Sequence, residues 1–321
     1  MFDSVLFVSF GGPNGPADVR PFLERVLHGK RVAPERIDEV AHHYELFGGV
    51  SPITELTRRQ ADGLRQRLVT AGHPLPVYVG MRNWHPLLAD TLREMHDAGA
   101  RHAIGFIAAA HQCYSSCEQY RDDVVAARTV LLQTSHGDVD TTYVGSWFDH
   151  PLFIEANARQ VRAALARLPT DLHAEARLVL TAHSIPLPMA EGSQYRQQLQ
   201  VSARLIAEKA RVSDWALVYQ SRSGRPGDRW LEPGVCGYLR TERARGLAAA
   251  VLHPVGFVCD HIEVLYDLDR EAADVCREIG LPIVRAQAVN DDPLFLDMMA
   301  DVVLRTIHRY TRGRPLPLVA R

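Results

Sequence analysis

Short apolar segments alternate with longer amphipathic segments along the whole chain. Eight of the apolar segments have the length of a strand, namely Ser4–Phe10, Leu75–Met81, His102–Ala109, Thr141–Trp147, Arg177–Ala182, Asp214–Gln220, Ala249–Val255 and Leu281–Arg285. Nearly continuous apolar runs of this length are typical of strands that are buried on both faces of a parallel sheet. The pattern therefore predicts eight parallel strands.

The segments between these runs have the pattern of helices. Ser51–Ala71 opens with Ser-Pro, a capping residue followed by proline at the first helical position. Gln194–Ala210 carries Leu199, Ala203 and Ile206 at helical spacing. An alternation of strands and helices indicates an α/β fold with right-handed crossovers.

The strands divide evenly between the two halves of the chain, which has 321 residues. We therefore predict two Rossmann-like lobes, 1–148 and 149–290, each a parallel sheet flanked by helices, with a cleft between them. The remaining segment, 291–321, is predicted to contain a helix, Pro293–Arg309, that crosses back onto the first lobe. In such folds functional side chains collect at the carboxyl ends of the strands.

Charge and cysteine content narrow the class of protein. The formal net charge is −2, so there is no basic surplus for a nucleic-acid backbone or an anionic membrane. The longest apolar runs are far shorter than a membrane span, and no signal peptide is recognisable. The five cysteines are scattered, and Cys113 and Cys117 lack partners at zinc-site spacing. We expect free thiols in a cytoplasmic protein without an integral membrane segment.

An acidic row follows the seventh predicted strand. A helix is expected to begin near Asp260, and on it Asp260, Glu263, Asp267 and Glu271 are spaced by three or four residues and so share one face. Such a row can bind or relay a divalent cation. The alternative is a solvated acidic helix face.

A histidine stands at the end of the fifth predicted strand. His183 is followed by Ser184 and, two residues later, by Pro186. It can take a proton near neutral pH or offer a nitrogen to a metal, or it can simply be hydrogen-bonded within a turn. Serine-hydrolase chemistry is disfavoured, because the chain has no Gly-x-Ser-x-Gly elbow. The loop 11–16 has neither a dinucleotide nor a phosphate-loop fingerprint, and indicates a tight turn or a close backbone approach.

Five segments, in this order along the chain, resemble the ferrochelatase family. They are Val5–Pro13, Tyr44–Pro52, Tyr114–Tyr120, Thr181–Pro186 and Pro254–Asp267. The resemblance spans about residues 3 to 305. It implies two Rossmann-like lobes that hold a porphyrin, and an enzyme of haem biosynthesis that inserts ferrous iron into the ring and releases two protons.

The resemblance also implies roles for the two segments described above. His183 matches the active-site histidine of the family, and Glu263 matches its acidic partner. Asp267 and Glu271 match an outer acidic row that holds or delivers metal, so all four are expected to contact the iron substrate. Two pyrrole protons must leave as the metal enters, which requires a base beside the ring. The pocket is expected to hold the ring bent.

The short bacterial branch of the family, which uses coproporphyrin III, fits best. The interval His28–His43 is short and polar where membrane-associated relatives carry an apolar lip, and a polar cleft suits a porphyrin with four carboxylates. Lys30, Arg31 and Arg82 are the expected carboxylate partners. The full set of expected porphyrin contacts is Phe10, Lys30, Arg31, Tyr44, Ser51, Arg82 and Tyr120.

Two departures from the family pattern limit what the resemblance implies. Phe10 stands where relatives often have tyrosine, and a phenyl ring cannot ligate the iron of the product. No cysteine follows Cys276, so we expect no 2Fe–2S cluster. A monomer without a nucleic-acid partner is expected. The alternatives are a protoporphyrin IX enzyme, a chelatase for another metal such as cobalt, and a non-enzymatic haem or porphyrin carrier.

Overall fold

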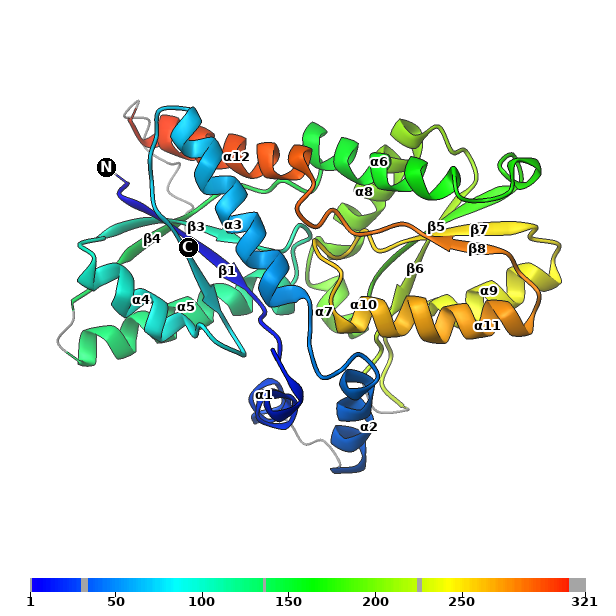
Figure 1. Cartoon of the computed structure of the whole chain (residues 1–321), viewed down its shortest axis with the longest axis horizontal. Helices are drawn as coiled ribbons and strands as arrows, with labels where there is room; N and C mark the ends of the chain where they lie inside the picture. Colours follow the sequence, from blue (N-terminus) through cyan, green and yellow to red (C-terminus); the bar gives the residue numbers. More distant parts are fainter. Residues whose placement is uncertain (1, 30–33, 135–136, 224–226, 312–321) are drawn as a thin grey trace.

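Two four-stranded parallel sheets lie side by side, and helices cover both faces of each (Figure 1). The computed structural model describes residues 2–29, 34–134, 137–223 and 227–311. All eight predicted strands are present, and the predicted α/β class is confirmed. The strand order is the same in both sheets. The second strand of each half lies at one edge, and the first, third and fourth strands follow it across the sheet.

The first sheet has the order β2-β1-β3-β4. Its strands are β1 (Ser4–Ser9), β2 (Val77–Met81), β3 (His102–Ile107) and β4 (Asp140–Tyr143). The helix α3 (Ile53–Thr70) covers one face, and α4 (Leu88–Asp97) and α5 (Gln119–Gln133) cover the other (Figure 1). All six residues of β1 are buried, as expected for a strand between two neighbours and two helical layers.

The second sheet has the order β6-β5-β7-β8. Its strands are β5 (Ala176–His183), β6 (Trp215–Gln220), β7 (Ala249–His253) and β8 (Ile283–Arg285). The helices α6 (Pro151–Leu165) and α8 (Tyr195–Ala210) cover one face, and α9 (Val235–Ala244), α10 (Ile262–Tyr266) and α11 (Ala273–Glu278) cover the other (Figure 1). β5 is a central strand; at its carboxyl end His183 pairs with Gln220 of β6, whereas the pairing with β7 ends at Leu180.

The remaining helices lie between or across the two sheets. They are α1 (Val19–Val26), α2 (Pro34–Glu45), α7 (Leu187–Glu191) and α12 (Pro293–Thr311), with 3-10 turns at Pro16–Asp18 and Thr170–Leu172 and π-helical turns at Tyr114–Glu118 and Asp267–Ala272. The helices α1 and α2 project from the middle of the molecule (Figure 1).

The last helix, α12, connects the two halves. It packs against α3 of the first half and against α6 of the second (Figure 1). The fully buried ring of Phe295 lies 5.9 Å from the ring of Trp147 and 6.2 Å from that of Phe153. Residues of both sheets thus share one apolar core. The division of the chain at residue 148 stays a prediction.

The glycine loop after β1 packs tightly on the start of α3. The helix begins at Ile53, with Pro52 at the capping position and no side-chain cap, so the predicted capping by Ser51 is wrong. The backbone N–H of Ser51 instead donates to the carbonyl of Pro13, at 2.8 Å. A Cβ on Gly12 would lie 2.7 Å from atoms of both Ser51 and Ile53, which explains why glycine is needed there. Of the two interpretations of the loop 11–16, close backbone approach is the one observed.

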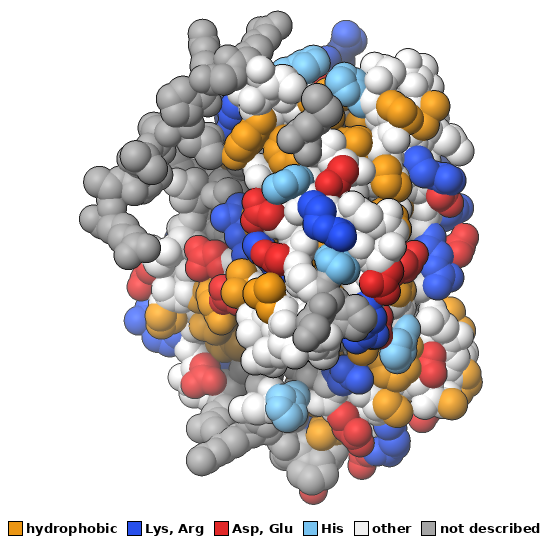
Figure 2. Space-filling view, turned by 90° about the vertical axis from the view of Figure 1, so that its left-hand side faces the viewer, with side chains coloured by type: hydrophobic (Ala, Val, Ile, Leu, Met, Phe, Trp, Pro, Cys, Tyr) orange, Lys and Arg blue, Asp and Glu red, His pale blue; other side chains and the backbone are white. Residues whose placement is uncertain are grey.

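Acidic and basic side chains are interspersed over the face shown in Figure 2. Among the helices that the structure describes, none combines the length and the apolar character required to cross a bilayer.

Candidate active site

His183 and Glu263 come together at the carboxyl end of the second sheet. His183 is the last residue of β5, and Glu263 lies in the first turn of α10. The imidazole Nε2 is 3.8 Å from the carboxylate Oε2. The two side chains are 32% and 46% exposed, so both can be reached by a substrate. The predicted pairing of these residues in space is therefore observed.

Local hydrogen bonds fix the ring of His183. Its Nδ1 lies 2.5 Å from the carbonyl oxygen of Ser184, which can only accept, so Nδ1 carries a proton. The Ser184 hydroxyl donates to the carbonyl of Leu231 at 2.9 Å, and the Tyr195 hydroxyl donates to the carbonyl of His183 at 3.1 Å. With Nδ1 protonated, Nε2 is the nitrogen that can accept a proton or bind a metal.

A second histidine positions Glu263. The N-cap of α10 is His261, whose Nδ1 accepts a hydrogen bond from the backbone N–H of Glu263 at 3.2 Å. Burial lowers the pKa of His261, which keeps the ring neutral and able to accept. The predicted cap, Asp260, is therefore wrong by one residue.

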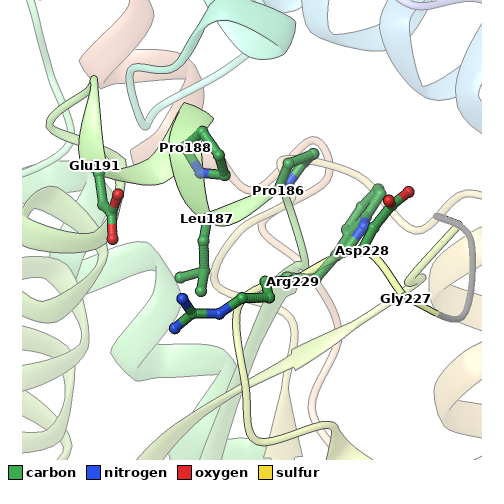
Figure 3. A pocket seen from close by; sticks show the side chains of 8 residues that line it. Pro186, Leu187, Pro188, Glu191, Gly227, Asp228 and Arg229 are labelled. Atoms are coloured by element: carbon green, nitrogen blue, oxygen red, sulfur yellow. The ribbon is translucent and has the colours of Figure 1, made fainter.

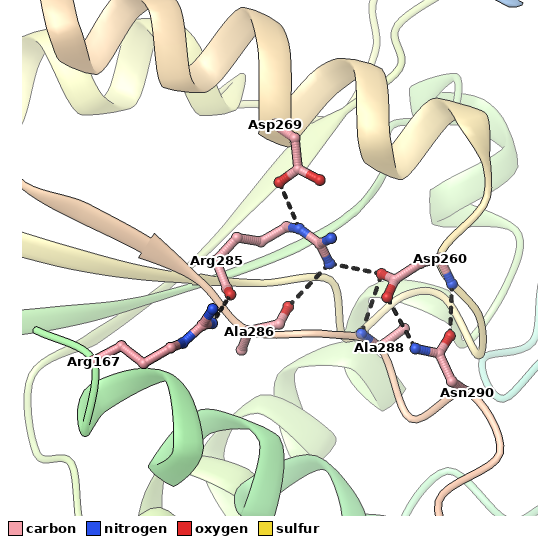
Figure 4. A network of polar contacts seen from close by, with 7 residues as sticks. All are labelled: Arg167, Asp260, Asp269, Arg285, Ala286, Ala288 and Asn290. Atoms are coloured by element: carbon pink, nitrogen blue, oxygen red, sulfur yellow. Dashed lines mark hydrogen bonds and ion pairs between the residues drawn. The ribbon is translucent and has the colours of Figure 1, made fainter. Parts of the chain in front are cut away.

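Asp260 does not belong to an acidic row. It lies before the helix, only 8% exposed, inside a network of polar contacts (Figure 4). Its carboxylate accepts from Arg285 Nη1 at 2.7 Å, from the backbone N–H of Ala288 at 3.2 Å and from Asn290 Nδ2 at 2.9 Å. Its own N–H donates to Asn290 Oδ1 at 2.8 Å. Asp260 thus joins the start of α10 to the segment that follows β8.

The other two acids continue along the helix in different environments. A π-helical turn, Asp267–Ala272, separates α10 from α11 and changes the spacing that a regular helix would have. Asp267 is 9% exposed and accepts from Gln220 Nε2 at 3.1 Å and from the Ser221 hydroxyl, whereas Glu271 is exposed. The predicted single stripe of four acids is therefore wrong.

Burial affects the charge of these carboxyls. It raises the pKa of Asp267 to about 7, and it also raises the pKa of Glu271. Asp267 is thus protonated in a large fraction of molecules at neutral pH. Among the described residues, no three His, Cys, Asp or Glu side chains converge as a metal site would require. His183 and Glu263 form a two-residue site.

The expected porphyrin contacts fall into separate groups. Phe10, Arg82 and Tyr120 form one cluster, in which the Arg82 guanidinium lies 4.3 Å from the centre of the Tyr120 ring and 5.8 Å from that of Phe10. Arg82 is 7% exposed and paired with Asp123. Its charge is therefore already neutralised, which weakens the expectation that it binds a substrate carboxylate. Lys30 and Arg31 lie outside the described residues.

Tyr44 and Ser51 are both buried, and Tyr44 lies beside this cluster. Tyr44 packs on the ring of Phe22 at 5.7 Å, and Phe22 in turn contacts Phe10 at 6.3 Å. Burial, with a smaller contribution from the charge of Glu263, raises the pKa of Tyr44, so its hydroxyl stays protonated. Tyr44 also shares an apolar cluster with Ile262, the residue before Glu263, so this cluster and the His183–Glu263 pair belong to one region of the molecule.

Two features of this region were missed by sequence reasoning. His43 of α2 stacks on Tyr266 of α10 with ring centres 3.5 Å apart, and no periodicity pairs these residues. A pocket of about 410 Å³ opens beside the segment that follows His183. Figure 3 shows Arg229 extending alongside Leu187 in its wall. The complete lining is Pro186, Leu187, Pro188, Glu191, Gly227, Asp228, Arg229 and Trp230.

Cys113 and Cys117 are free thiols, as predicted, the first buried and the second partly exposed. Cys113 is the N-cap of the π-helical turn Tyr114–Glu118, and Cys117 lies within that turn. Burial raises the pKa of Cys117, so its thiol keeps its proton near neutral pH.

The two-lobed architecture is the chelatase fold. The sirohydrochlorin chelatase SirB from Bacillus subtilis subspecies spizizenii, solved in complex with cobalt, aligns with a TM-score of 0.57 at 10% identity, covering 98% of both chains. The structure of CbiX, the terminal enzyme of sirohaem biosynthesis in denitrifying bacteria, aligns with a TM-score of 0.52 at 12% identity, covering 94% of this chain and 98% of that one.

Sequence comparison defines the family. The ferrochelatase family model matches residues 3–307, so the chain belongs to the ferrochelatase family. A ferrochelatase from Rhodopirellula baltica is 45% identical over 94% of this chain and 85% of its own. Coproporphyrin III ferrochelatases from Mycobacteroides abscessus and Nocardia farcinica are 42% and 44% identical, over 98% and 94% of this chain and 90% and 87% of theirs.

Proposed function

We propose that this ferrochelatase inserts Fe(II) into coproporphyrin III, giving iron coproporphyrin III and two protons, as a step of haem biosynthesis. The observation that carries the proposal is the solvent-open His183–Glu263 pair, 3.8 Å apart at the end of a central strand. Family membership supports metal insertion into a porphyrin, and relatives that are 42% and 44% identical and named for coproporphyrin III support this porphyrin.

The pair suits the proton chemistry of insertion. Two pyrrole N–H protons leave as the metal enters, and Nε2 of His183 accepts a proton because Nδ1 is held protonated by the carbonyl of Ser184. The carboxylate of Glu263 stabilises the imidazolium that forms. Ferrous iron, the second substrate, accepts imidazole and carboxylate donors. A site with two protein donors holds the ion loosely and releases it to the four ring nitrogens.

The alternatives are less well supported. A porphyrin or haem carrier has no need of a base beside a carboxylate. The cobalt-bound solved structure shares only the fold with this chain and is 10% identical, so it does not favour cobalt. The proposal also includes a cytoplasmic monomer without a 2Fe–2S cluster. Because Phe10 has no ligating atom, we propose that its ring contacts the porphyrin without ligating the iron of the product.

The proposed substrate leads to a specificity prediction. The specificity constant should be at least about tenfold higher for coproporphyrin III than for protoporphyrin IX, a difference of about 1.4 kcal/mol in transition-state binding. The reason is that two additional propionates can be bound in the polar cleft implied by the interval 28–43. Steady-state kinetics with both porphyrins in the same detergent would measure the ratio. Equal specificity constants would contradict the coproporphyrin assignment.

A second prediction concerns the outer acids. Replacing Asp267 and Glu271 by Asn and Gln should raise the half-saturating concentration of ferrous iron about threefold or more, with porphyrin affinity unchanged, if these carboxyls attract or relay the cation. Glu263→Gln should instead lower turnover at saturating iron, because we place that carboxylate beside the ring. Initial rates over a range of iron concentrations, at fixed ionic strength, distinguish the two effects.

The matched control replaces two carboxylates of α11, the helix that follows the π-helical turn. Asp274 and Glu278 on α11 are paired with Arg277 and Arg240. The double variant Asp274→Asn/Glu278→Gln should leave the iron dependence unchanged. If the outer pair behaves like this control, Asp267 and Glu271 have no part in metal delivery.

A further inference from the structure

A second pocket, of about 270 Å³, lies at the carboxyl ends of β3 and β4. Its lining consists of Gly105, Ile107, Ala109, Ala110, Gln112, Cys117, Arg121, Tyr143, Val144, Gly145, Ser146 and Trp147. In open α/β sheets the carboxyl ends of the strands are where ligands bind. None of the residues assigned above to metal or porphyrin lines this pocket.

Two polar side chains of this pocket have no hydrogen-bond or ion-pair partner among the described residues, and for one of them, which is buried, this is unusual. Arg121 is an exposed residue whose guanidinium lies 4.9 Å from the centre of the Tyr143 ring and, within the described part of the chain, is paired with no carboxylate. The Tyr143 hydroxyl oxygen is buried and has no hydrogen-bond partner among the described residues. Buried hydroxyl groups are almost always hydrogen-bonded in native proteins, so this orphaned group calls for an explanation.

Both groups are hydrogen-bond donors. Burial raises the pKa of Tyr143 to about 12, so its hydroxyl keeps its proton at neutral pH. The guanidinium of Arg121 is always charged and offers a planar set of N–H donors that matches a carboxylate. A cation beside a protonated phenol selects an anion, and the planar guanidinium selects a carboxylate in particular.

The walls of the pocket are held rigidly. Trp147 is buried and stacks on Phe106 with ring centres 5.5 Å apart. Gln112 forms two hydrogen bonds with Gln198 of α8, one from its backbone N–H at 2.7 Å and one to its side-chain oxygen at 3.1 Å. Because α8 belongs to the second sheet, these bonds place the pocket next to the junction between the two halves. A pocket whose walls are already in place favours binding.

The pocket also adjoins the cluster assigned to the porphyrin. Tyr120, the residue before Arg121, contacts Arg82 at 4.3 Å between guanidinium carbon and ring centre. Arg82 is neutralised by Asp123, whereas Arg121 is not neutralised by any described carboxylate. Of these two arginines near the start of α5, Arg121 is the one with a charge available for a ligand.

We infer that Arg121 and Tyr143 form a carboxylate-binding pocket at the junction of the two halves. The carboxylate is either a propionate arm of the bound porphyrin or a separate small carboxylate. Binding of a porphyrin propionate rests on the proposed function, whereas binding of a separate carboxylate does not. In both cases the guanidinium and the phenol O–H donate to the carboxylate oxygens.

The experiment uses the metal-free full-length protein and two probes. One is sodium propionate, compared with sodium chloride at equal ionic strength in a thermal-unfolding assay. The other is coproporphyrin III, whose dissociation constant is measured by fluorescence quenching without iron. Both are applied to the wild type and to the variants Arg121→Gln, Arg121→Lys and Tyr143→Phe. Arg65→Gln, at an exposed arginine of α3 that pairs with Asp62, is the control for loss of one positive charge.

Each result has a definite meaning. If a porphyrin propionate occupies the pocket, Arg121→Gln and Tyr143→Phe weaken coproporphyrin III binding about tenfold and about threefold, and Arg121→Lys weakens it less than Arg121→Gln. If a separate carboxylate occupies it, propionate raises the unfolding temperature of the wild type above that in chloride, Arg121→Gln abolishes the rise, and porphyrin affinity is unchanged.

The inference is overturned if the Arg121 and Tyr143 variants match Arg65→Gln with both probes. If Arg121→Gln fails to fold, Tyr143→Phe and Arg121→Lys give the same comparison, because both variants keep a positive charge at position 121. Because neither probe requires turnover, a protein that binds carboxylate here but inserts no iron would refute the proposed function and not this inference.

Discussion

Replacing His183 by alanine should lower the rate of iron insertion at least about 100-fold, while the dissociation constant of the porphyrin changes less than about threefold. A positioned general base contributes about 10²–10⁴-fold to a proton transfer. His183 offers only one edge, Nε2, to the reacting ring, because Nδ1 is engaged with the carbonyl of Ser184. The substitution removes the base but leaves Phe10 and Tyr120, the expected porphyrin contacts, in place.

The two quantities are measured separately. Turnover is followed anaerobically at saturating ferrous iron, and porphyrin binding is followed by fluorescence in the absence of metal. His308→Ala, at an exposed histidine of α12, is the control for loss of an imidazole elsewhere. A residual rate above about a tenth of the wild type, a loss of less than about 1.4 kcal/mol, would mean that His183 is not the essential base.

Replacing Asp260 by alanine should lower the free energy of unfolding by about 3 kcal/mol. The change leaves the guanidinium of Arg285, which is 16% exposed, without its more buried partner, and removes the acceptor for Ala288 and Asn290 (Figure 4). Breaking a buried ion pair by removing one partner costs about 3–5 kcal/mol, and the second partner of Arg285, Asp269, keeps the cost near the lower end.

The control removes that second partner. The Asp269 side chain is 35% exposed, and Asp269→Ala should cost less than about 1 kcal/mol. Urea unfolding gives both free energies. The half-saturating concentration of iron should be unchanged in Asp260→Ala where the variant is folded. If Asp260→Ala left the free energy of unfolding unchanged but raised the half-saturating concentration of iron, Asp260 would have a role in metal delivery instead.

The strands could be predicted because burial on both faces leaves a simple signal. All of Ser4–Ser9 is buried, and the predicted strand there differs from β1 by one residue. The signal reports burial rather than strand geometry, however. The apolar run Thr141–Trp147 predicted a strand through Trp147, but β4 ends at Tyr143. The Trp147 side chain is buried outside the strand, where its ring packs on that of Phe153, 5.2 Å away.

The site could be predicted only in part, because the environment of a charge is a tertiary property. His183 was recognisable from its place at the end of a strand, and Glu263 from the acidic row after the seventh strand together with the resemblance to the ferrochelatase family. Asp260 has the same spacing as a metal ligand, yet its partner Arg285 lies 25 residues away in the sequence. The π-helical turn at Asp267–Ala272 cannot be read from a period of 3.6 residues, and it leaves Asp267 buried and Glu271 exposed.

The same limit applies to the basic residues. Arg82 directly follows β2, and Arg121 lies in the first turn of α5. The sequence around them does not show which of the two is paired with a carboxylate. Only the fold shows that Arg82 is paired with Asp123 and that Arg121 lies over Tyr143.

The most direct test of the central claim is anaerobic incubation of the pure protein with ferrous iron and coproporphyrin III, followed by absorbance. The account predicts that the free-porphyrin spectrum is converted to that of the iron porphyrin with the wild type, and that the free-porphyrin spectrum persists with His183→Ala. Porphyrin binding by the wild type without any conversion on addition of iron would contradict it and identify a carrier instead of an enzyme.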